Sequence, residues 1–221
     1  MTVADFSLEN EVETRVDRFG ASKTTRRWAI TNLRHSELDL SRWRLFADLT
    51  NFHAHPIAGC DSRNQKFDPR TEDPGEGYLR VGCNIDAVLE AGETYRVELE
   101  YEESNYFLHL PKANCWVVDE WFYRSPYEGP YVQQEPEPWC FKLHIADARW
   151  SFLGIRNPTQ SFHVETCLPV KLLRNRAGVS FSWPINLRPG ERSEKMYVLC
   201  MLRSRLDLAR LLNVARLVFP F

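Results

Sequence analysis

Apolar and polar residues alternate along several short stretches of the chain, with the period of two that is typical of a half-buried β-strand. The clearest case is 94–103, where Tyr95, Val97, Leu99 and Tyr101 share one face and charged residues occupy the other. The pattern predicts that these four side chains point into a core. The charged residues are predicted to face water, where they would also discourage pairing at the edge of a sheet.

Strand-like segments recur at short intervals over most of the chain. They are rich in β-branched and aromatic residues, which suit a pleated sheet. Their ranges are 26–33, 41–52, 78–86, 94–103, 106–110, 115–123, 140–152, 161–173, 178–187 and 195–202. Turn-forming residues separate them, so we expect an all-β protein built as an antiparallel β-sandwich or barrel.

Two segments do not show this pattern. Residues 1–27 are polar and charged with apolar residues at mixed spacing, which leaves a short strand, a helix and an extended arm as open alternatives. Residues 55–77 are rich in Gly, Pro, Asp and Asn and are too long for a tight hairpin. We expect them to form the largest surface loop of the first half.

A proline-rich segment divides the chain. Residues 126–139 contain four prolines, each of which removes a backbone donor and holds the preceding residue extended. This composition indicates a hinge. It would join a first β-sandwich domain, residues 1–125, to a second β domain, residues 140–221.

The two halves share local sequence features. An apolar strand ends in Thr-Asn-Leu at 31–33, an Ala-Gly-Glu turn at 91–93 leads into an alternating strand, and a Pro-Gly-Glu turn follows at 189–191. This pattern resembles bacterial immunoglobulin-like β-sandwich modules. The resemblance implies two immunoglobulin-like halves and a tendency to bind other proteins.

The end of the chain shows a helical period instead. In 204–221, Ser204 can cap a helix and Pro220 stops it, and apolar residues fall at helical spacing on one face. The residues on that face are Leu208, Leu211, Leu212, Ala215 and Phe219. This amphipathic helix either packs on its own sheet or docks on another protein, in which case these residues form the partner-binding surface.

Charge is unevenly distributed along the chain. The net charge is −2, but residues 1–125 carry −7 and residues 126–221 carry +5. No basic segment followed by an apolar run opens the sequence, and no uninterrupted apolar stretch is long enough for a membrane span. We therefore expect a cytoplasmic protein without membrane contact, whose six cysteines are mostly reduced core residues.

One group of residues is a candidate for a metal site or a thiol-dependent hydrolytic site. His53 and His55 would point to the same side of a strand, and Cys60 or Asp61 would complete a tetrahedral site. Alternatively, Cys60 would act as a nucleophile beside these histidines. No second close pair of ligands follows, and no nucleophile elbow, phosphate-binding loop or zinc-protease motif occurs. The sequence therefore favours a protein without an enzymatic role and without a cofactor.

Nucleic-acid binding is the stronger alternative. Phe181 and Trp183 alternate onto one face of a predicted strand, and basic residues lie near them in sequence, as in proteins that bind single strands. The basic residues are Lys171, Arg174, Arg176, Arg188 and Arg192. Packing of both rings in the core is the competing interpretation.

The sequence thus predicts a nonenzymatic cytoplasmic protein that serves as an interaction module or accessory subunit of a larger assembly. Its contacts with another protein are expected at the acidic first half, the basic second half and the final helix. The alternatives are a single-stranded nucleic-acid binder that uses the basic block 171–216, and a metal- or thiol-dependent hydrolase centred on His53, His55 and Cys60.

Overall fold

The fold consists of β-strands throughout the part of the chain that the computed structural model describes. This part comprises residues 5–17, 19, 21–49, 54–67, 69–72, 79–104, 108–110, 115–123, 127–128, 137–147, 150–156, 164–165, 171–187 and 192–201. The all-β prediction is confirmed for these residues. None of them belongs to a helix with the length and hydropathy needed to cross a bilayer.

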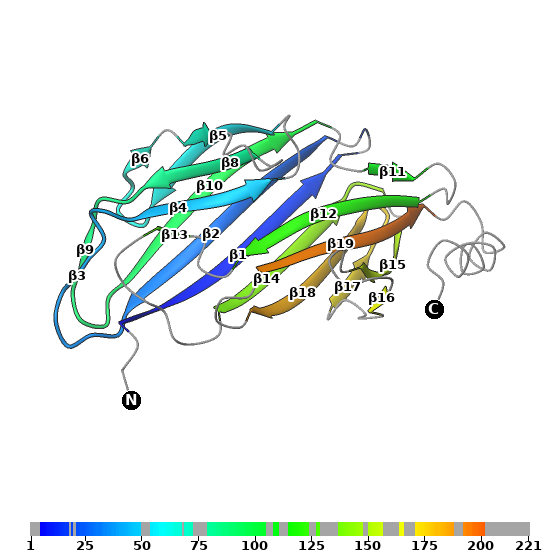
Figure 1. Ribbon diagram of the computed structural model, residues 1–221. Coiled ribbons are helices and arrows are strands. Elements are labelled where there is room, and N and C mark those ends of the chain that lie inside the picture. Colours follow the sequence, from blue (N-terminus) through cyan, green and yellow to red (C-terminus); the bar gives the residue numbers. More distant parts are fainter. Residues whose placement is uncertain are drawn as a thin grey trace.

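The largest sheet, called the main sheet below, has eight strands in the order β17-β18-β14-β1-β2-β10-β5-β6. Figure 1 shows it running diagonally through the molecule, from β5 to β17. In that order the strands are β17 (Lys171–Arg174), β18 (Val179–Leu187), β14 (Glu137–Ile145), β1 (Phe6–Val16), β2 (Ser22–Asn32), β10 (Thr94–Glu103), β5 (Ala54–Asp61) and β6 (Lys66–Phe67).

Three smaller sheets complete the described fold. A four-stranded sheet contains β13 (Tyr127–Glu128), β4 (Arg44–Leu49), β8 (Leu79–Asn84) and β7 (Arg70–Glu72). A five-stranded sheet contains β11 (Leu108–Leu110), β12 (Cys115–Tyr123), β19 (Arg192–Met201), β15 (Trp150–Arg156) and β16 (Val164–Glu165). The short strands β3 (Leu38–Asp39) and β9 (Val88–Leu89) pair with each other.

Strand β1 settles the open question about the first segment of the chain. Its burial alternates from Phe6 to Val16, so it is a long strand with one face inside. The alternation was hidden in the sequence because two of its buried positions are the polar residues Asn10 and Thr14. Thr14 is accommodated by a hydrogen bond with Thr24 on β2, with 3.0 Å between the two Oγ1 atoms.

The expectation of a purely antiparallel sandwich is wrong at one strand pair. β1 pairs antiparallel with β2 on one side and parallel with β14 on the other, where Asn10 lies opposite Trp139 and Val16 opposite Ile145. A parallel pair needs a long connection between its strands, and here the connection is most of the chain. The main sheet is therefore mixed, and it draws strands from before and after the predicted hinge.

The prediction that 55–77 is a surface loop is also wrong for the part that is described, residues 55–67 and 69–72. β5 pairs with β10 from Ala54 to Asp61, and β6 and β7 follow it. Gly59 has a structural role here, because the Phe67 ring of β6 lies where a Cβ atom on residue 59 would be. The glycine that suggested a loop instead permits close packing of two strands.

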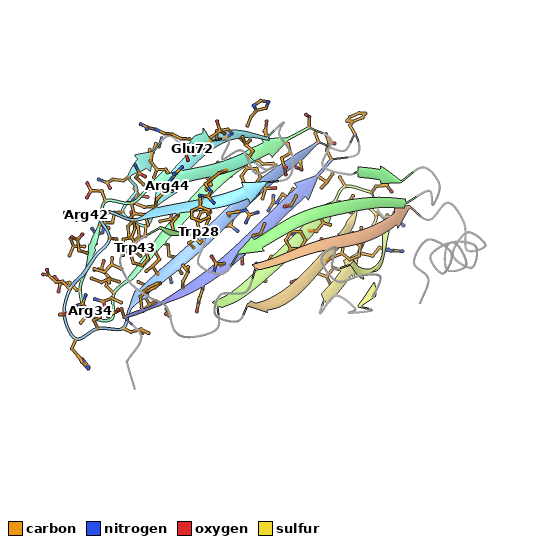
Figure 2. The ribbon with its side chains drawn as sticks, in the orientation of Figure 1. Trp28, Arg34, Arg42, Trp43, Arg44 and Glu72 are labelled. Carbon is orange, nitrogen blue, oxygen red and sulfur yellow. The ribbon has the colours of Figure 1, made fainter. Side chains whose placement is uncertain are left out.

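The core lies between the main sheet and the four-stranded sheet. The predicted inward residues Tyr95, Val97, Leu99 and Tyr101 are all buried in it. Trp28 of β2 and Trp43 also belong to this core, and Figure 2 shows both side chains in the region between the two layers. The Trp43 ring meets the Phe6 ring edge-on, with centroids 4.8 Å apart.

The predicted hinge overlaps with described strands at two places. Tyr127 and Glu128 of β13 pair with β4, and β14 begins at Glu137. Pro138 of β14 pairs with Asn186 of β18. The ladder between β14 and β1 begins one residue later, at Trp139, so the N–H group that Pro138 lacks is not needed for pairing with β1. The division into domains 1–125 and 140–221 stays a prediction. The helix predicted at 204–221 lies outside the described residues.

Candidate functional site

The strands of the main sheet have one face toward the core, and polar residues predominate on the other face, called the outer face below. Strand register aligns these residues in rows across the sheet. In one row, Glu11 on β1 lies opposite Arg27 on β2, and Arg27 lies opposite Glu98 on β10. Cys140 of β14 and Cys60 of β5 extend this row at its two ends. We call these five residues the Arg27 row.

Arg27 is the centre of an ion-pair network on this face. Its Nη1 atom lies 2.6 Å from Glu11 Oε1 and 3.0 Å from Glu13 Oε2, and its Nε lies 2.7 Å from Glu98 Oε2. Lys142 of β14 adds a contact of 2.5 Å from its Nζ to Glu11 Oε2. The guanidinium of Arg27 thus joins carboxylates of β1 and β10, the two neighbours of β2. Arginine suits this position because its planar guanidinium holds several N–H donors in a fixed geometry.

The network changes the acidity of its members. Partial burial acts to raise the pKa of Glu11, but hydrogen bonds from Lys142 and Arg27 outweigh it and hold the pKa below the ordinary value. Burial is likewise outweighed at Glu13 by hydrogen bonds from Arg15 and Arg27, so its pKa is also lowered. These carboxylates therefore stay ionised and compensated at neutral pH.

A second row lies next to the first. Ala29 on β2 has Glu9 of β1 opposite it on one side and Arg96 of β10 on the other. We call these three residues the Ala29 row. Glu9 and Arg96 are exposed, and neither side chain makes an ion pair with a described residue. The hydroxyl of Ser62 is used within the fold, since it accepts a hydrogen bond of 3.2 Å from the Arg96 backbone N–H.

The two rows surround an open depression of about 650 Å³. Five strands of the main sheet contribute to it, and the small side chain of Ala29 lies between the longer ones of its row. Its lining residues are Glu9, Asn10, Glu11, Arg27, Trp28, Ala29, Cys60, Asp61, Ser62, Arg96, Val97, Glu98 and Cys140. A volume of this size suits a small molecule or a few residues of a peptide.

The surroundings of Cys60 and Asp61 constrain the chemistry of the lining. Desolvation raises the pKa of the Cys60 thiol, and the negative charge of Glu98 raises it further, so the reactive thiolate form is disfavoured. The carboxylate of Asp61 accepts a hydrogen bond of 2.5 Å from the Tyr95 hydroxyl and further ones from the backbone of Arg63 and Gln65. In the described part of the chain, no three His, Cys, Asp or Glu residues are grouped as metal ligands.

The residues predicted for a metal or thiol site are not brought together as far as they are described. His55 lies opposite Glu102 and Cys60 opposite Glu98, with Ala58 opposite Glu100 between them. The two positions are four residues apart along β10, which is about 13 Å along a strand. His53 lies outside the described residues.

The predicted nucleic-acid surface is described only in part. Phe181 is 1% exposed, so its ring is buried and does not offer a face to a base. Arg174 and Arg176 are exposed at the β17–β18 hairpin. Lys171, Trp183 and Arg192 lie in strands whose side chains are not described there, and Arg188 lies outside the described residues. The helical residues Leu208, Leu211, Leu212, Ala215 and Phe219 also lie outside.

Sequence reasoning assigned no role to Glu9, Arg27 or Arg96. Their grouping depends on which strands are neighbours, and the unassigned state of 1–27 removed β1 from consideration. A partial signal was present, because Arg27 and Glu98 have opposite charge and lie on the polar phases of two predicted strands.

No family model matches the chain. No curated protein matches its sequence. Among solved structures, its fold is similar to an M1 zinc metallopeptidase from Deinococcus radiodurans, with 11% identity and a TM-score of 0.45 over 88% of this chain. It is also similar to a proposed nutrient binding protein from Legionella pneumophila, with 7% identity and a TM-score of 0.47 over 90% of this chain and 68% of that one. This chain spans only 42% of the length of the peptidase chain. These are likenesses between β-rich sheets and assign no family.

Proposed function

We propose that this protein is a nonenzymatic interaction module or accessory subunit, and that a partner protein adds an acidic extended segment to the edge of the main sheet at β17. The finer fold assignment, two immunoglobulin-like halves with their tendency to bind proteins, is part of this proposal. So is the cytoplasmic location that the sequence predicts.

The observation that carries the proposal is the character of the β17 edge. Among the described residues, β17 is the last strand of the main sheet, and it pairs there with β18 alone. An edge strand presents backbone N–H and C=O groups that can pair with another extended segment. Leu173 in the middle of this strand is 55% exposed, which supplies an apolar contact beside the backbone.

The charge of this edge selects the kind of partner. Arg174 and Arg176 are exposed next to Leu173, within the basic second half of the chain. The hairpin that carries them is held by Asn175, whose Oδ1 accepts hydrogen bonds of 2.8 Å from the N–H of Ala177 and 3.1 Å from that of Gly178. A fixed edge with two cations favours an acidic segment over a neutral or basic one. The helical face at 204–221 is a second predicted contact.

Affinity capture from the native host with chemical cross-linking, followed by mass spectrometry, tests the proposal. Leu173→Asp and the double variant Arg174→Glu/Arg176→Glu are expected to lose the partner that the parent protein captures. Val88→Asp is the matched control, because Val88 is 45% exposed in a different strand pair. Equal capture by the parent protein and the β17 variants would refute docking at this edge.

The same variants separate the nucleic-acid alternative. If the basic residues bind a phosphate backbone, direct titration with a single-stranded oligonucleotide at about 150 mM salt should show micromolar affinity that falls steeply as salt rises. We expect no such binding. Capture that disappears after nuclease treatment would favour that alternative over a protein partner.

A further inference from the structure

We propose that the depression over the Ala29 row binds a small zwitterion, a molecule that carries one ammonium and one carboxylate group, such as a free α-amino acid. This inference concerns a different face from the β17 edge and does not depend on partner docking there. It rests on the residual charges of the depression, on their spacing, and on the small residue between them.

Most of the charged residues that line the depression already have partners within the fold. Glu11 and Glu98 are both paired with Arg27, and Glu11 is paired with Lys142 as well. Asp61 is occupied by hydrogen bonds from Tyr95 and from its own turn. A ligand that competed for these groups would have to break contacts that already exist.

The remaining charged groups of the lining are Glu9 and Arg96. Neither forms an ion pair with another described residue, and their charges are opposite. A ligand with only a positive charge would be attracted by Glu9 and repelled by Arg96. A ligand with only a negative charge would be attracted by Arg96 and repelled by Glu9. Charge complementarity therefore favours a ligand that carries both signs.

The distance between Glu9 and Arg96 suits a small molecule. Glu9 and Arg96 are on opposite sides of Ala29, each one strand away from it. Two inter-strand spacings place their backbones roughly 10 Å apart. Both side chains are long enough to lean inward, and a small molecule between them would separate the carboxylate from the guanidinium.

Ala29 forms the floor of the site. Ala29 is half-buried and ends at Cβ, whereas its neighbours on the outer face of β2 are Arg27 and Thr31. A larger residue at 29 would fill the space that the depression occupies. The position therefore leaves room above the sheet for the body of a ligand whose two charged ends point to β1 and β10.

An α-amino acid fits these features in one orientation. Its ammonium group donates hydrogen bonds to the Glu9 carboxylate, and its carboxylate accepts the paired N–H groups of Arg96, the geometry in which guanidinium recognises carboxylate best. Its side chain then extends along the depression toward the Arg27 row, where the charges are compensated and the thiol groups of Cys60 and Cys140 lie at the ends.

The experiment is a titration of the full chain by calorimetry or by NMR, with three matched probes. L-alanine carries both charges, N-acetyl-L-alanine carries only the negative one, and L-alanine amide carries only the positive one. We expect L-alanine to bind with a Kd of about 1 mM or tighter, and each blocked probe to bind about tenfold more weakly. L-alanyl-L-alanine, with its charges further apart, distinguishes a free amino acid from a short peptide as the preferred zwitterion.

Two variants test the assigned residues. Glu9→Gln and Arg96→Met are each expected to weaken L-alanine binding about tenfold, because each removes one charge-assisted contact. Glu102→Gln is the matched control, since Glu102 is another exposed carboxylate on the outer face of β10 but does not line the depression. Thermal melts of all three variants verify that the fold is kept. Ala29→Leu should abolish binding by filling the floor.

The outcomes that would overturn the proposal are specific. It fails if L-alanine does not bind at millimolar concentration, or if the two blocked probes bind as well as L-alanine. It also fails if Glu9→Gln and Arg96→Met, while folded, bind L-alanine as the parent protein does. Failure of this site would leave docking at β17 untouched, because the two tests use different residues and different ligands.

Discussion

Replacing Arg27 with methionine removes the cation that joins three carboxylates on the outer face of the main sheet. Methionine keeps the length of the stem, so the change isolates the charge. The Arg27 side chain is 40% exposed, and its partners Glu11, Glu13 and Glu98 are 29%, 14% and 36% exposed. Because solvent screens the charges of such accessible ion pairs, each pair contributes about 0.2–1 kcal/mol to the free energy of unfolding.

The expected loss is smaller than a simple sum of the three pairs. They share one guanidinium, and Lys142 and Arg15 still compensate Glu11 and Glu13 after the change. We therefore expect Arg27→Met to lower the free energy of unfolding by about 1–2 kcal/mol. In a chain of this size that corresponds to roughly 2 to 8 °C in Tm.

Urea and thermal unfolding followed by circular dichroism measure the effect. Arg96→Met is the matched control, because Arg96 lies on the same face without an ion pair to a described residue, and we expect a change within about 0.5 kcal/mol. The difference between the two variants should shrink in about 1 M salt, where the Debye length is about 3 Å. If Arg27→Met and Arg96→Met unfold at the same midpoint, the network does not stabilise the sheet and the reasoning fails.

Two further predictions concern pH and the hinge. Because the folded-state pKa values of Glu11 and Glu13 lie below their ordinary value of 4.5, the unfolded chain takes up these protons first, so stability should be fully present above 4.5 and decline as the pH falls below it. Urea midpoints across that range should show a shallower decline for Arg27→Met than for the parent protein, and parallel curves would contradict the assignment. Limited proteolysis should cut between Tyr127 and Glu137, as the proline content of 126–139 predicts. Two resistant fragments that separate on a sizing column would support two domains, whereas fragments that elute together would show that the ladder between β1 and β14 holds them.

The sequence predicted strands well where one face is apolar and the other polar. β10 is such a case, and all four of its predicted core residues are buried. Its charged face was less well interpreted. Glu98 and Glu100 do not protect a sheet edge, since β10 lies between β2 and β5 and these carboxylates pair with Arg27 and Lys23. Glu103, the last residue of β10, is buried.

Prediction failed where burial did not follow hydropathy. β1 buries Asn10 and Thr14, and β5 contains a proline, a glycine and an exposed Ile57, so neither shows the usual pattern. The candidate site could not be predicted from the sequence for a related reason. Glu9, Ala29 and Arg96 come from three strands, and only the register of the sheet places them in one row. A single sequence contains no direct record of that register.

The parallel pairing of β1 with β14 has a consequence for how the chain is made. β1 forms its hairpin with β2 early, but Lys142 of β14, which pairs with Glu11, follows it by 131 residues. At about 5–20 residues per second, ribosomal synthesis needs roughly 7 to 26 s to supply that stretch. During this interval one edge of the nascent hairpin has no native neighbour, and such an edge can pair with other nascent chains. Glu9, Glu11 and Glu13 then line the outer face of an open edge strand as a run of like charges, which would repel a second copy of the same strand until β14 arrives.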